Sequence, residues 1–415
     1  MSAIIHATEA DILKQLSLQR PWMETRLLEL VNLNSGTQNY QGVNAVGALI
    51  SALFSERLAA PVEKIQLDPW QKITLSGQSV ESPLASLWCL RKRPRAPLQV
   101  LLCGHLDTVF PLESGFQQAT YLTENTLNGP GAADMKGGLL VMLAALEALE
   151  QHPLCANLGW TVLLNPDEEI GSPGSAAWLA KEAVHHHIGL VYEPCLPDGC
   201  LAGARKGSGN FSLLIQGRSA HAGREPENGR NAIVAAARTI GQLEALNGVR
   251  EGLTLNTGII AGGETTNQVP DLTVVKFNIR IKTAQDAHWS LMQLEKIQQS
   301  INQCEGFSAR LYGGFGRMPK QLDHKHLALY QLVKDCGAAL NLELNWQPTG
   351  GCCDGNNLSN LGLANIDTLG VRGGFIHSVD EYICLDSLTE RAGLSALLLF
   401  QLAHHGLPFY PAPET

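Results

Sequence analysis

The sequence lacks the features that mark membrane and secreted proteins. No stretch of about 18 consecutive apolar residues occurs, so we predict no membrane span. Residues 1–30 contain no uninterrupted apolar segment behind a basic start, so we expect no secretory signal. None of the 10 cysteines belongs to a CxxC pair. Free thiols in a reducing cytosol explain this better than a disulfide framework, and we expect a cytoplasmic protein.

An excess of basic residues is also absent. The 30 Lys and Arg residues are outnumbered by 39 Asp and Glu residues, which gives a formal net charge of -9. Nucleic-acid-binding domains normally carry a basic patch or stripe, so this balance argues against such a partner. We find no internal repeat and no low-complexity segment. The 415 residues therefore predict two or three globular domains with ample chain for a core.

The first part of the chain alternates short apolar runs with helical patterns. Residues 99–103, 160–164 and 188–192 are predicted strands, and residues 137–149 (GGLLVMLAALEAL) are a predicted helix. Strands that alternate with helices indicate a mainly parallel sheet covered on both faces. From about residue 315 this pattern returns, and it ends in a predicted helix over 387–405. We therefore expect one α/β domain from residues 1–204 and 315–415.

The middle of the chain has a different order of predicted strands and helices. Here the predicted order is strand, helix, strand, strand, helix, strand, over residues 211–216, 231–246, 253–260, 272–281, 284–303 and 308–312. That order is typical of a split βαβ sandwich, which needs about a hundred residues. The sequence therefore predicts an inserted α+β domain over residues 205–314.

Histidines and carboxylates gather where the predicted strands end. His105 and Asp107 follow the first strand, Glu168 and Glu169 follow the second, and Glu193 follows the third. Open α/β sheets build their sites at these carboxyl ends. A single His or Asp there is more often only a turn residue. Successive strand ends that all offer such side chains are harder to explain in that way, so we expect a functional site.

The residue types favour a metal. Histidine and carboxylate ligands suit Zn²⁺, with Co²⁺ or Mn²⁺ as alternatives, and no cysteine ligand is needed. Glu168 and Glu169 are adjacent, and in an extended segment they point to opposite sides. One of them can then bind metal while the other transfers protons.

Six segments carry a resemblance to a known family. In chain order they are GHLDTVFP, GPGAADMKGG, PDEEIGSPGS, YEP, GRSAHAG and IHSVDEY. With them the sequence resembles the M20 family of metallopeptidases, and within it the carboxypeptidase G2 (glutamate carboxypeptidase) group. The resemblance spans nearly the whole chain, and the ordered set of motifs is highly specific. It implies a di-zinc catalytic domain over 1–204 and 315–415, and a lid domain over 205–314 that forms a homodimer.

The resemblance also implies roles for single residues. Five positions match the ligands of two Zn²⁺ ions per chain: His105, Asp134, Glu169, Glu193 and His377. In this match Asp134 bridges both metals, with Glu169 and His377 on one and His105 and Glu193 on the other. Glu168 matches the general base, and Asp107 matches the carboxylate that orients His105. The family often has a cis peptide after the bridging residue, where Asp134 and Met135 lie here.

Three lid positions complete the implied site. His221 matches the histidine that stabilises the oxyanion, which family members take from the partner subunit. Asn267 and Arg280 match the residues that hold the substrate's carboxylate. Arg280 sits in a predicted strand, where its guanidinium can grip a carboxylate with two hydrogen bonds. The alternative is a strand arginine in a structural salt bridge.

The implied activity is that of a zinc amidohydrolase or exopeptidase. It cleaves an amide bond next to a free carboxylate in a small peptide-like or N-acyl amino-acid substrate. The alternatives are an N-acyl amino-acid deacetylase or a dipeptidase of the same fold. A catalytically inactive relative is disfavoured because every ligand and Glu168 are present. Gly350-Gly351-Cys352-Cys353-Asp354 departs from the family's Gly-Gly-Gly-Thr-Asp, which leaves the identity of the substrate open.

Overall fold

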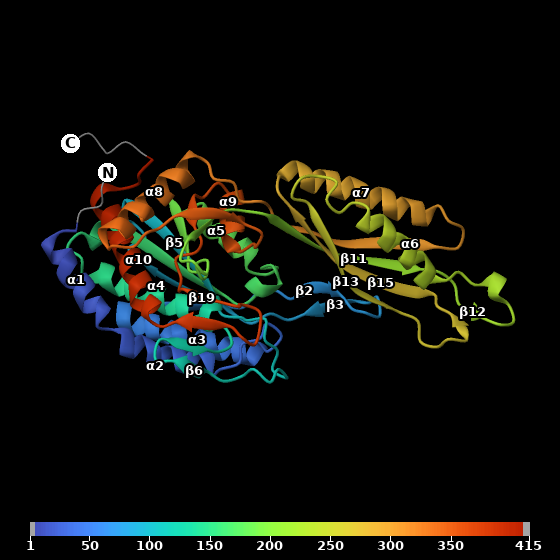
Figure 1. Ribbon diagram of the computed structural model, residues 1–415, viewed down its shortest axis with the longest axis horizontal. Helices are drawn as coiled ribbons and strands as arrows, with labels where there is room; N and C mark the ends of the chain where they lie inside the picture. Colours follow the sequence, from blue (N-terminus) through green and yellow to red (C-terminus); the bar gives the residue numbers. More distant parts are fainter. Residues whose placement is uncertain (1–4, 410–415) are drawn as a thin grey trace.

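The computed structural model describes residues 5–409 and has two lobes (Figure 1). The larger lobe contains both ends of the described chain, and the smaller lobe is formed by a segment from its middle. The predicted α/β domain with an inserted α+β domain is confirmed. None of the helices in the described range combines the length and the apolar composition that a membrane span requires.

A six-stranded sheet forms the centre of the larger lobe. Its order is β1 (Val62–Ile65), β4 (Leu87–Lys92), β8 (Leu158–Asn165), β5 (Leu98–His105), β9 (Ile188–Val191) and β18 (Asn365–Ile366). The last four strands are parallel, whereas β1 and β4 pair antiparallel at one edge. Because β5 lies between β8 and β9, the residues that follow these three strands meet at one end of the sheet.

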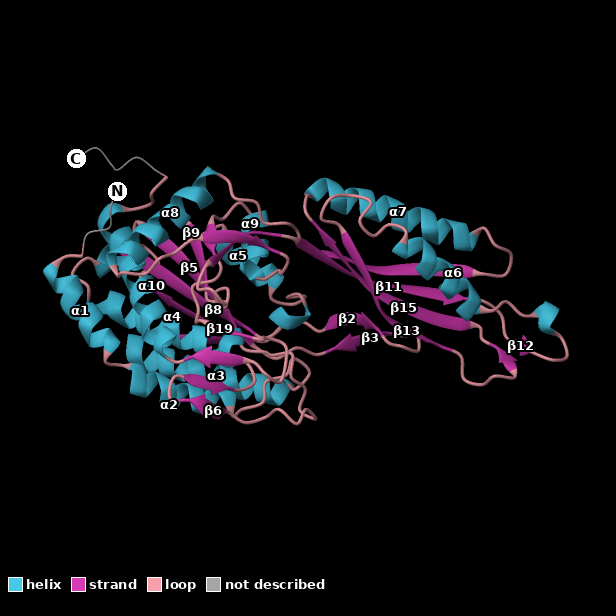
Figure 2. Ribbon diagram, in the orientation of Figure 1, coloured by secondary structure: helices cyan, strands magenta, loops and turns pink. Residues whose placement is uncertain are grey.

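Helices cover both faces of this sheet (Figure 2). On one face Val100, Leu102 and Val162 join a core with α3 (Tyr40–Leu58), α4 (Gly137–Gln151) and α10 (Asp386–His405). On the other face Leu101 and Leu163 pack with α5 (Ala176–Ala183) and α9 (Asp354–Asn360). Successive side chains of a strand point to opposite faces, so near-continuous apolar runs are expected where both faces are covered.

Smaller elements surround the central sheet. Three further helices are α1 (Ala7–Ser17), α2 (Arg20–Val31) and α8 (His324–Ala339). The remaining strands form short sheets: β2 (Trp70–Ile73) with β3 (Ser79–Ser82), β10 (Leu201–Arg205) with β17 (Trp346–Thr349), and β19 (Gly373–Gly374), β20 (Tyr382–Cys384), β7 (Thr126–Asn128) and β6 (Thr120–Thr123).

The smaller lobe is a four-stranded antiparallel sheet with two helices on one face (Figure 2). The strand order is β13 (Thr254–Gly262), β15 (Leu272–Ile281), β11 (Gly207–Gln216) and β16 (Ser308–Arg317). Its helices are α6 (Ala232–Glu244) and α7 (Ala284–Asn302), and the antiparallel pair of β12 (Ala220–His221) and β14 (Gln268–Val269) lies at its far tip. Phe211, Leu213 and Ile215 pack beneath the helices, while the alternate positions of β11 face the other way.

Strand β16 is longer than the sequence indicates. We predicted a strand over 308–312, but β16 continues to Arg317. Gly313, Gly314 and Gly316 interrupt the apolar alternation, and glycine is depleted in strands, so the continuation carries no sequence signal. This extension brings Arg317 back to the larger lobe.

The two connections between the lobes lie side by side. The backbone N–H groups of Arg205 and Lys320 each donate to the carbonyl oxygen of the other, at 3.0 Å. Buried Asp367 accepts from Arg205 Nε at 2.8 Å and from Lys320 Nζ at 3.0 Å. Both crossings are therefore fastened to the larger lobe at one point. We propose residues 205–314 as the lid domain; its last strand, β16, runs on to Arg317, and we count the end of this strand with the lid.

Candidate metal centre and substrate pocket

The loops after the parallel strands bring the predicted site residues together. His105 ends β5, Glu168 and Glu169 lie in the turn η3 (Glu168–Ile170) after β8, and Glu193 follows β9. Asp134 comes from the turn η1 (Ala132–Lys136) before α4. His377 comes from the loop between β19 and β20.

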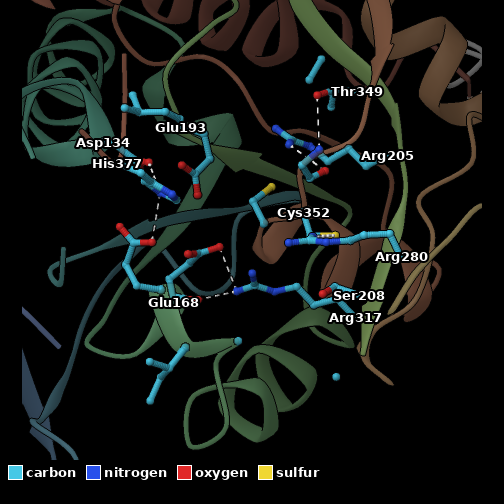
Figure 3. A pocket seen from close by; sticks show the side chains of 18 of the residues that line it. Asp134, Glu168, Glu193, Arg205, Ser208, Arg280, Arg317, Thr349, Cys352 and His377 are labelled. Carbon is cyan, nitrogen blue, oxygen red and sulfur yellow. Dashed lines mark hydrogen bonds and ion pairs between the residues drawn. The ribbon is translucent and has the colours of Figure 1, made fainter. Parts of the chain in front are cut away.

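Five of these side chains form two groups that share Asp134. His105 Nε2 lies 3.1 Å from Asp134 Oδ1 and 3.7 Å from Glu193 Oε2. His377 Nε2 lies 3.3 Å from Asp134 Oδ2 and 3.4 Å from Glu169 Oε2 (Figure 3). In each group one ligand atom per residue lies within 4.8 Å of the others. The two oxygens of Asp134 thus face different groups, as a bridging carboxylate requires.

The chemistry of both groups fits divalent metal ions. Bonds of about 2.0–2.2 Å in tetrahedral geometry hold ligand atoms roughly 3.3–3.5 Å apart. Three carboxylates with little exposed surface lie close together here, and Glu193 Oε1 is buried without a hydrogen-bond partner among the described residues. Burial raises the pKa of Glu169 to about 7 and that of Glu193 to about 8. Such crowded carboxylates need a cation, so the residues fit a dinuclear centre.

Glu381 holds the backbone around Asp134. Its carboxylate accepts from the N–H groups of Ala133 at 2.9 Å and Asp134 at 3.1 Å. Burial, with the charge of Asp134, raises the pKa of Glu381 to about 7. The peptide bond between Asp134 and Met135 is cis. Sequence reasoning gave Glu381 no role, although it lies inside the quoted IHSVDEY motif.

Asp107 contacts both the histidine and the glutamates. Its carboxylate accepts from the backbone N–H groups of Glu168 and Glu169, each at 3.2 Å, and from Thr37 Oγ1 at 2.8 Å. His105 Nδ1 lies 2.9 Å from the backbone oxygen of Asp107 and 3.5 Å from its carboxylate. Asp107 therefore orients His105 through its main chain, while its side chain fixes the loop that carries both glutamates.

Glu168 is paired with an arginine from the lid. Arg317 Nη2 lies 2.8 Å from Glu168 Oε1 and donates to the backbone oxygen of Glu168 at 2.9 Å (Figure 3). The same nitrogen contacts Ser172 Oγ at 2.9 Å and Asp354 Oδ1 at 3.4 Å. Burial raises the pKa of Glu168 to about 8, and the charge of Arg317 opposes this shift. Sequence reasoning missed Arg317 because no quoted motif contains it.

Arg280 shares a cavity with the two ligand groups. The cavity has a volume of about 890 Å³ and is lined from the larger lobe by Asp134, Glu168 and His377, among others. From the lid, Ser208, Arg280 and Arg317 line it. Arg280 Nη1 lies 3.1 Å from Cys352 Sγ. Within residues 5–409 no carboxylate is at ion-pairing distance from Arg280, so its charge is available to a ligand.

His221 and Asn267 lie elsewhere. His221 belongs to β12, which pairs with β14 at the far tip of the lid, and Asn267 immediately precedes β14 (Figure 1). Ala222 N donates to Asn267 O at 3.0 Å, which ties the two segments together. His221 is exposed, and neither residue lines the cavity. A single chain therefore does not bring these two side chains to the candidate metal groups.

A third cluster has metal-binding residue types but different hydrogen bonding. Glu9 Oε1 lies 3.3 Å from both His152 Nε2 and His404 Nε2. His152 Nδ1, however, accepts from the backbone N–H of Leu154 at 3.1 Å. Because a metal-bound histidine normally donates from its second nitrogen, His152 has the wrong tautomer for a ligand. This cluster is better explained as a hydrogen-bonded link between α1 and the end of α10.

Comparison with known proteins agrees with this arrangement. Residues 101–401 match the Peptidase family M20/M25/M40. Carboxypeptidase G2 of Pseudomonas sp. (strain RS-16) is 27% identical over 393 residues, covering 92% of this chain and 90% of that protein. Succinyl-diaminopimelate desuccinylase of Dechloromonas aromatica (strain RCB) is 28% identical over 347 residues, covering 77% of this chain and 87% of that protein.

A solved structure shares the fold. The Bacillus subtilis YXEP protein, described as a dinuclear metal binding peptidase from the M20 family, superposes with a TM-score of 0.66 at 14% identity. The match covers 93% of this chain and 99% of that one. The matched family span of 101–401 contains both ligand groups and Glu168. The chain therefore belongs to the M20/M25/M40 peptidase family and is a hydrolase with the two-lobed fold of that family.

Proposed function

We propose that this hydrolase is a glutamate carboxypeptidase-like enzyme that cleaves an amide bond next to a free carboxylate. The observation that carries the proposal is the position of Arg280. Its guanidinium lines the same cavity as the two ligand groups and has no carboxylate partner among residues 5–409. A guanidinium can hold a carboxylate by two parallel hydrogen bonds, which fixes the position of the neighbouring amide. The substrate is a small peptide-like or N-acyl amino-acid molecule that spans both lobes.

The metal requirement follows from the ligand groups. We propose two Zn²⁺ ions, with Co²⁺ or Mn²⁺ as alternatives, held by His105, Asp134, Glu169, Glu193 and His377. When bound, such ions supply an acidified water and polarise the scissile carbonyl.

Glu168 is the proposed general base. It takes the proton of the attacking water and later delivers it to the leaving amine. Its raised pKa, about 8, suits a group that must both accept and release a proton near neutral pH. The positive charge of Arg317 offsets the free-energy cost of burying the carboxylate of Glu168. Asp107 holds the backbone of Glu168 in position.

A homodimer would complete the site. Strand β13 is one of the two edge strands of the lid sheet, and its Ile259 and Ile260 are 46% and 50% exposed. Open apolar edges favour pairing with another strand, and a two-fold axis would pair β13 with itself. We propose that each lid tip then reaches the partner's cavity. There His221 would stabilise the oxyanion and Asn267 would assist in holding the carboxylate.

The second candidate function is N-acyl amino-acid deacylation or dipeptide hydrolysis by the same machinery. One of the relatives in the comparison is a desuccinylase, which favours keeping this candidate. The two functions differ only in the group that is released. We also propose a cytoplasmic location, which the ten free cysteines support.

A substrate panel tests the proposal. The protein would be loaded separately with Zn²⁺, Co²⁺ and Mn²⁺ and assayed with acyl-glutamates, dipeptides and acetyl-amino acids. Each substrate would be paired with its carboxamide analogue, in which the free carboxylate is amidated. We expect hydrolysis of the acids, led by acyl-glutamates, and little hydrolysis of the amidated forms. Equal rates on both members of each pair would reject carboxylate recognition, and a protein that binds no metal would favour an inactive relative.

A further inference from the structure

Three asparagines form a row across the lid sheet. Asn256 on β13 lies opposite Asn278 on β15, and Asn278 lies opposite Asn210 on β11. On the next strand, β16, Gly314 lies opposite Asn210. The row therefore crosses the whole sheet and consists of three carboxamides and a residue without a side chain.

The fold does not require this row. Asparagine is depleted in strands, so three in register need another explanation. The neighbouring positions Phe211, Leu255 and Phe277 are buried beneath the lid helices and form the lid's core. The asparagines lie on the opposite face, where Asn210 and Asn256 are exposed and Asn278 is half-buried. All three line the cavity that residues of the two ligand groups also line.

Hydrogen bonds fix one of the three asparagine side chains and leave polar atoms of the other two free to bind a ligand. Asn278 Nδ2 contacts Ser208 Oγ at 2.9 Å, Gly209 O at 3.0 Å and Asn210 Oδ1 at 2.8 Å. The amide group of Asn278 is thereby fixed, and the carbonyl oxygen of Asn210 is occupied. The N–H donors of Asn210 and both ends of the Asn256 carboxamide have no protein partner within residues 5–409. Free donors at fixed positions recognise oxygen atoms.

The surroundings favour a substrate's side chain at this place. Arg280 lies two residues beyond Asn278 on the same face of β15, and Ser208 is its cross-strand neighbour. A group held at the row is therefore close to the group held by Arg280. Next to Asn210, a side chain added at Gly314 would meet open space, so the row has room in front of it.

We propose that Asn210, Asn256 and Asn278 form a subsite for the side chain of the residue whose α-carboxylate Arg280 holds. The subsite accepts a planar end group with carbonyl-type oxygens, which is a side-chain carboxylate or carboxamide. Donors from Asn210 and Asn256 contact the oxygens, and Asn256 Oδ1 can accept from a carboxamide. The inference rests on the proposed function, since it assumes that Arg280 holds the α-carboxylate.

Three substrates of similar size test this subsite: N-benzoyl-glutamate, N-benzoyl-glutamine and N-benzoyl-leucine. The metal-loaded enzyme should hydrolyse the first two with the higher kcat/KM. Asn210→Ala and Asn256→Ala should each lower kcat/KM by roughly three- to tenfold on the glutamine substrate, the effect of losing one neutral hydrogen bond, and by roughly 10- to 100-fold on the glutamate substrate, whose carboxylate is charged. The change should appear mainly in KM. Hydrolysis of the leucine substrate should be unaffected.

Ser212→Ala provides the matched control. Ser212 lies on the same face of β11, two residues beyond Asn210, and does not line the cavity. It should leave all three substrates unchanged. Equal losses on all three substrates in the asparagine variants, or a wild-type enzyme without preference for glutamate and glutamine over leucine, would overturn the subsite.

A binding measurement separates this inference from the proposed function. Calorimetry with free glutamate, glutamine and leucine reports the subsite without turnover. Tighter binding of glutamate and glutamine, lost in Asn210→Ala, would support the subsite even if none of the benzoyl substrates is cleaved. Failure of hydrolysis together with this binding pattern would reject the proposed reaction alone. Equal binding of the three amino acids would reject the subsite.

Discussion

Arg317 of the lid and Glu168 of the larger lobe are joined by one guanidinium nitrogen that contacts two atoms of the same glutamate. Nη2 lies 2.8 Å from the carboxylate oxygen Oε1 and 2.9 Å from the backbone oxygen. Both residues are buried. The last strand of the lid therefore supplies the counter-ion of the proposed base and also contacts its main chain.

We predict that Arg317→Ala lowers kcat by one to two orders of magnitude while both metals stay bound. Removing one partner of a buried pair leaves an uncompensated charge, which costs about 3–5 kcal/mol of stability. Arg317→Lys should rescue poorly, because an ammonium cannot reproduce the planar contact. Kinetics, metal analysis and thermal melts check this. Arg310→Ala, an exposed arginine of the same strand, should behave as wild type. Unchanged kcat in Arg317→Ala would remove its assigned role.

Glu168 and Glu169 should respond differently to the same substitution. Glu168→Gln should retain its metal but lose on the order of 10²–10⁴ in kcat, the usual contribution of a positioned general base. Glu169→Gln should weaken metal binding, because its Oε2 lies 3.4 Å from His377 Nε2 in one ligand group. Metal content by elemental analysis, measured beside kcat, separates the two roles. If both variants lose metal, the assignment is wrong.

Metal affinity should rise with pH. In the metal-free protein, hydrogen bonds to Asp134 and Glu169 raise the pKa of His377 to about 11. The pKa of His105 is also raised well above its ordinary value: burial lowers it, but the charge of Glu193 and hydrogen bonds to the carboxylates of Asp107, Asp134 and Glu193 together outweigh burial. Both histidines then carry protons at neutral pH, and a metal must displace them. We expect apparent affinity to increase about tenfold per pH unit for each displaced proton. Chelator competition between pH 6 and 8 measures this, and a flat profile would contradict it.

The same shifts give the metal-free protein a distinct pH profile. Because the folded pKa values of His377 and His105 are raised, their contribution to stability is complete below the unfolded value of about 6.5. It declines as the pH rises toward the folded pKa, which is about 11 for His377. Melting temperatures of the metal-free protein should therefore fall from pH 6 to 9, whereas those of the metal-loaded protein should change less.

Arg280→Ala should act on substrates according to their charge. The variant should lose on the order of 10- to 100-fold in kcat/KM on substrates with a free α-carboxylate, as expected for a hydrogen bond to a charged group. Amidated analogues should be affected much less. Arg280→Lys should rescue little, since it lacks the two-point contact. Cys352→Ala removes only the thiol beside Nη1 and serves as the matched control. Equal losses on both substrate types would reject the role of Arg280.

The dimer prediction concerns β13. Ile260→Lys places a charge on the exposed edge and should yield monomers, measured by sedimentation, with a reduced kcat if the partner supplies His221. Mixing His221→Ala with Glu168→Gln should restore activity, because one hybrid site then has both intact residues. His288→Ala, an exposed histidine of α7, should show no loss and needs no partner. No recovery despite proven subunit exchange would count against a shared site.

The sequence predicted most of the elements because their patterns are local. Strand β15 matches its predicted range of 272–281, since its apolar alternation is regular. Three of the five ligand residues, His105, Glu169 and Glu193, follow strands of one parallel sheet, and the order of those strands places them together, whereas Asp134 and His377 come from loops outside that sheet. The division of the five residues around Asp134 is the one that the family resemblance implies.

Contacts between distant segments could not be predicted. Arg317 meets Glu168 only because β16 continues past its apolar pattern, through three glycines that give no strand signal. The asparagine row exists only through the register of three strands, and Asn210 and Asn278 are 68 positions apart in the chain. Glu381 was inside a quoted motif, but its contact with the backbone of Asp134 depends on the folded loop.

The paired crossing at Arg205 and Lys320 has a consequence for how far each part of the lid can move. Because both connections are fastened to Asp367, a rotation of the lid about this point would displace each residue in proportion to its distance from it. Arg280 and Arg317 both lie opposite Ser208, near the crossing, so such a rotation would displace them little and could leave their contacts in the cavity intact. The pair of β12 and β14, which includes His221, lies at the opposite end of the lid and would therefore move farthest (Figure 1). A small rotation at Asp367 would thus become a large displacement of His221, the residue that we propose to act in the partner's cavity.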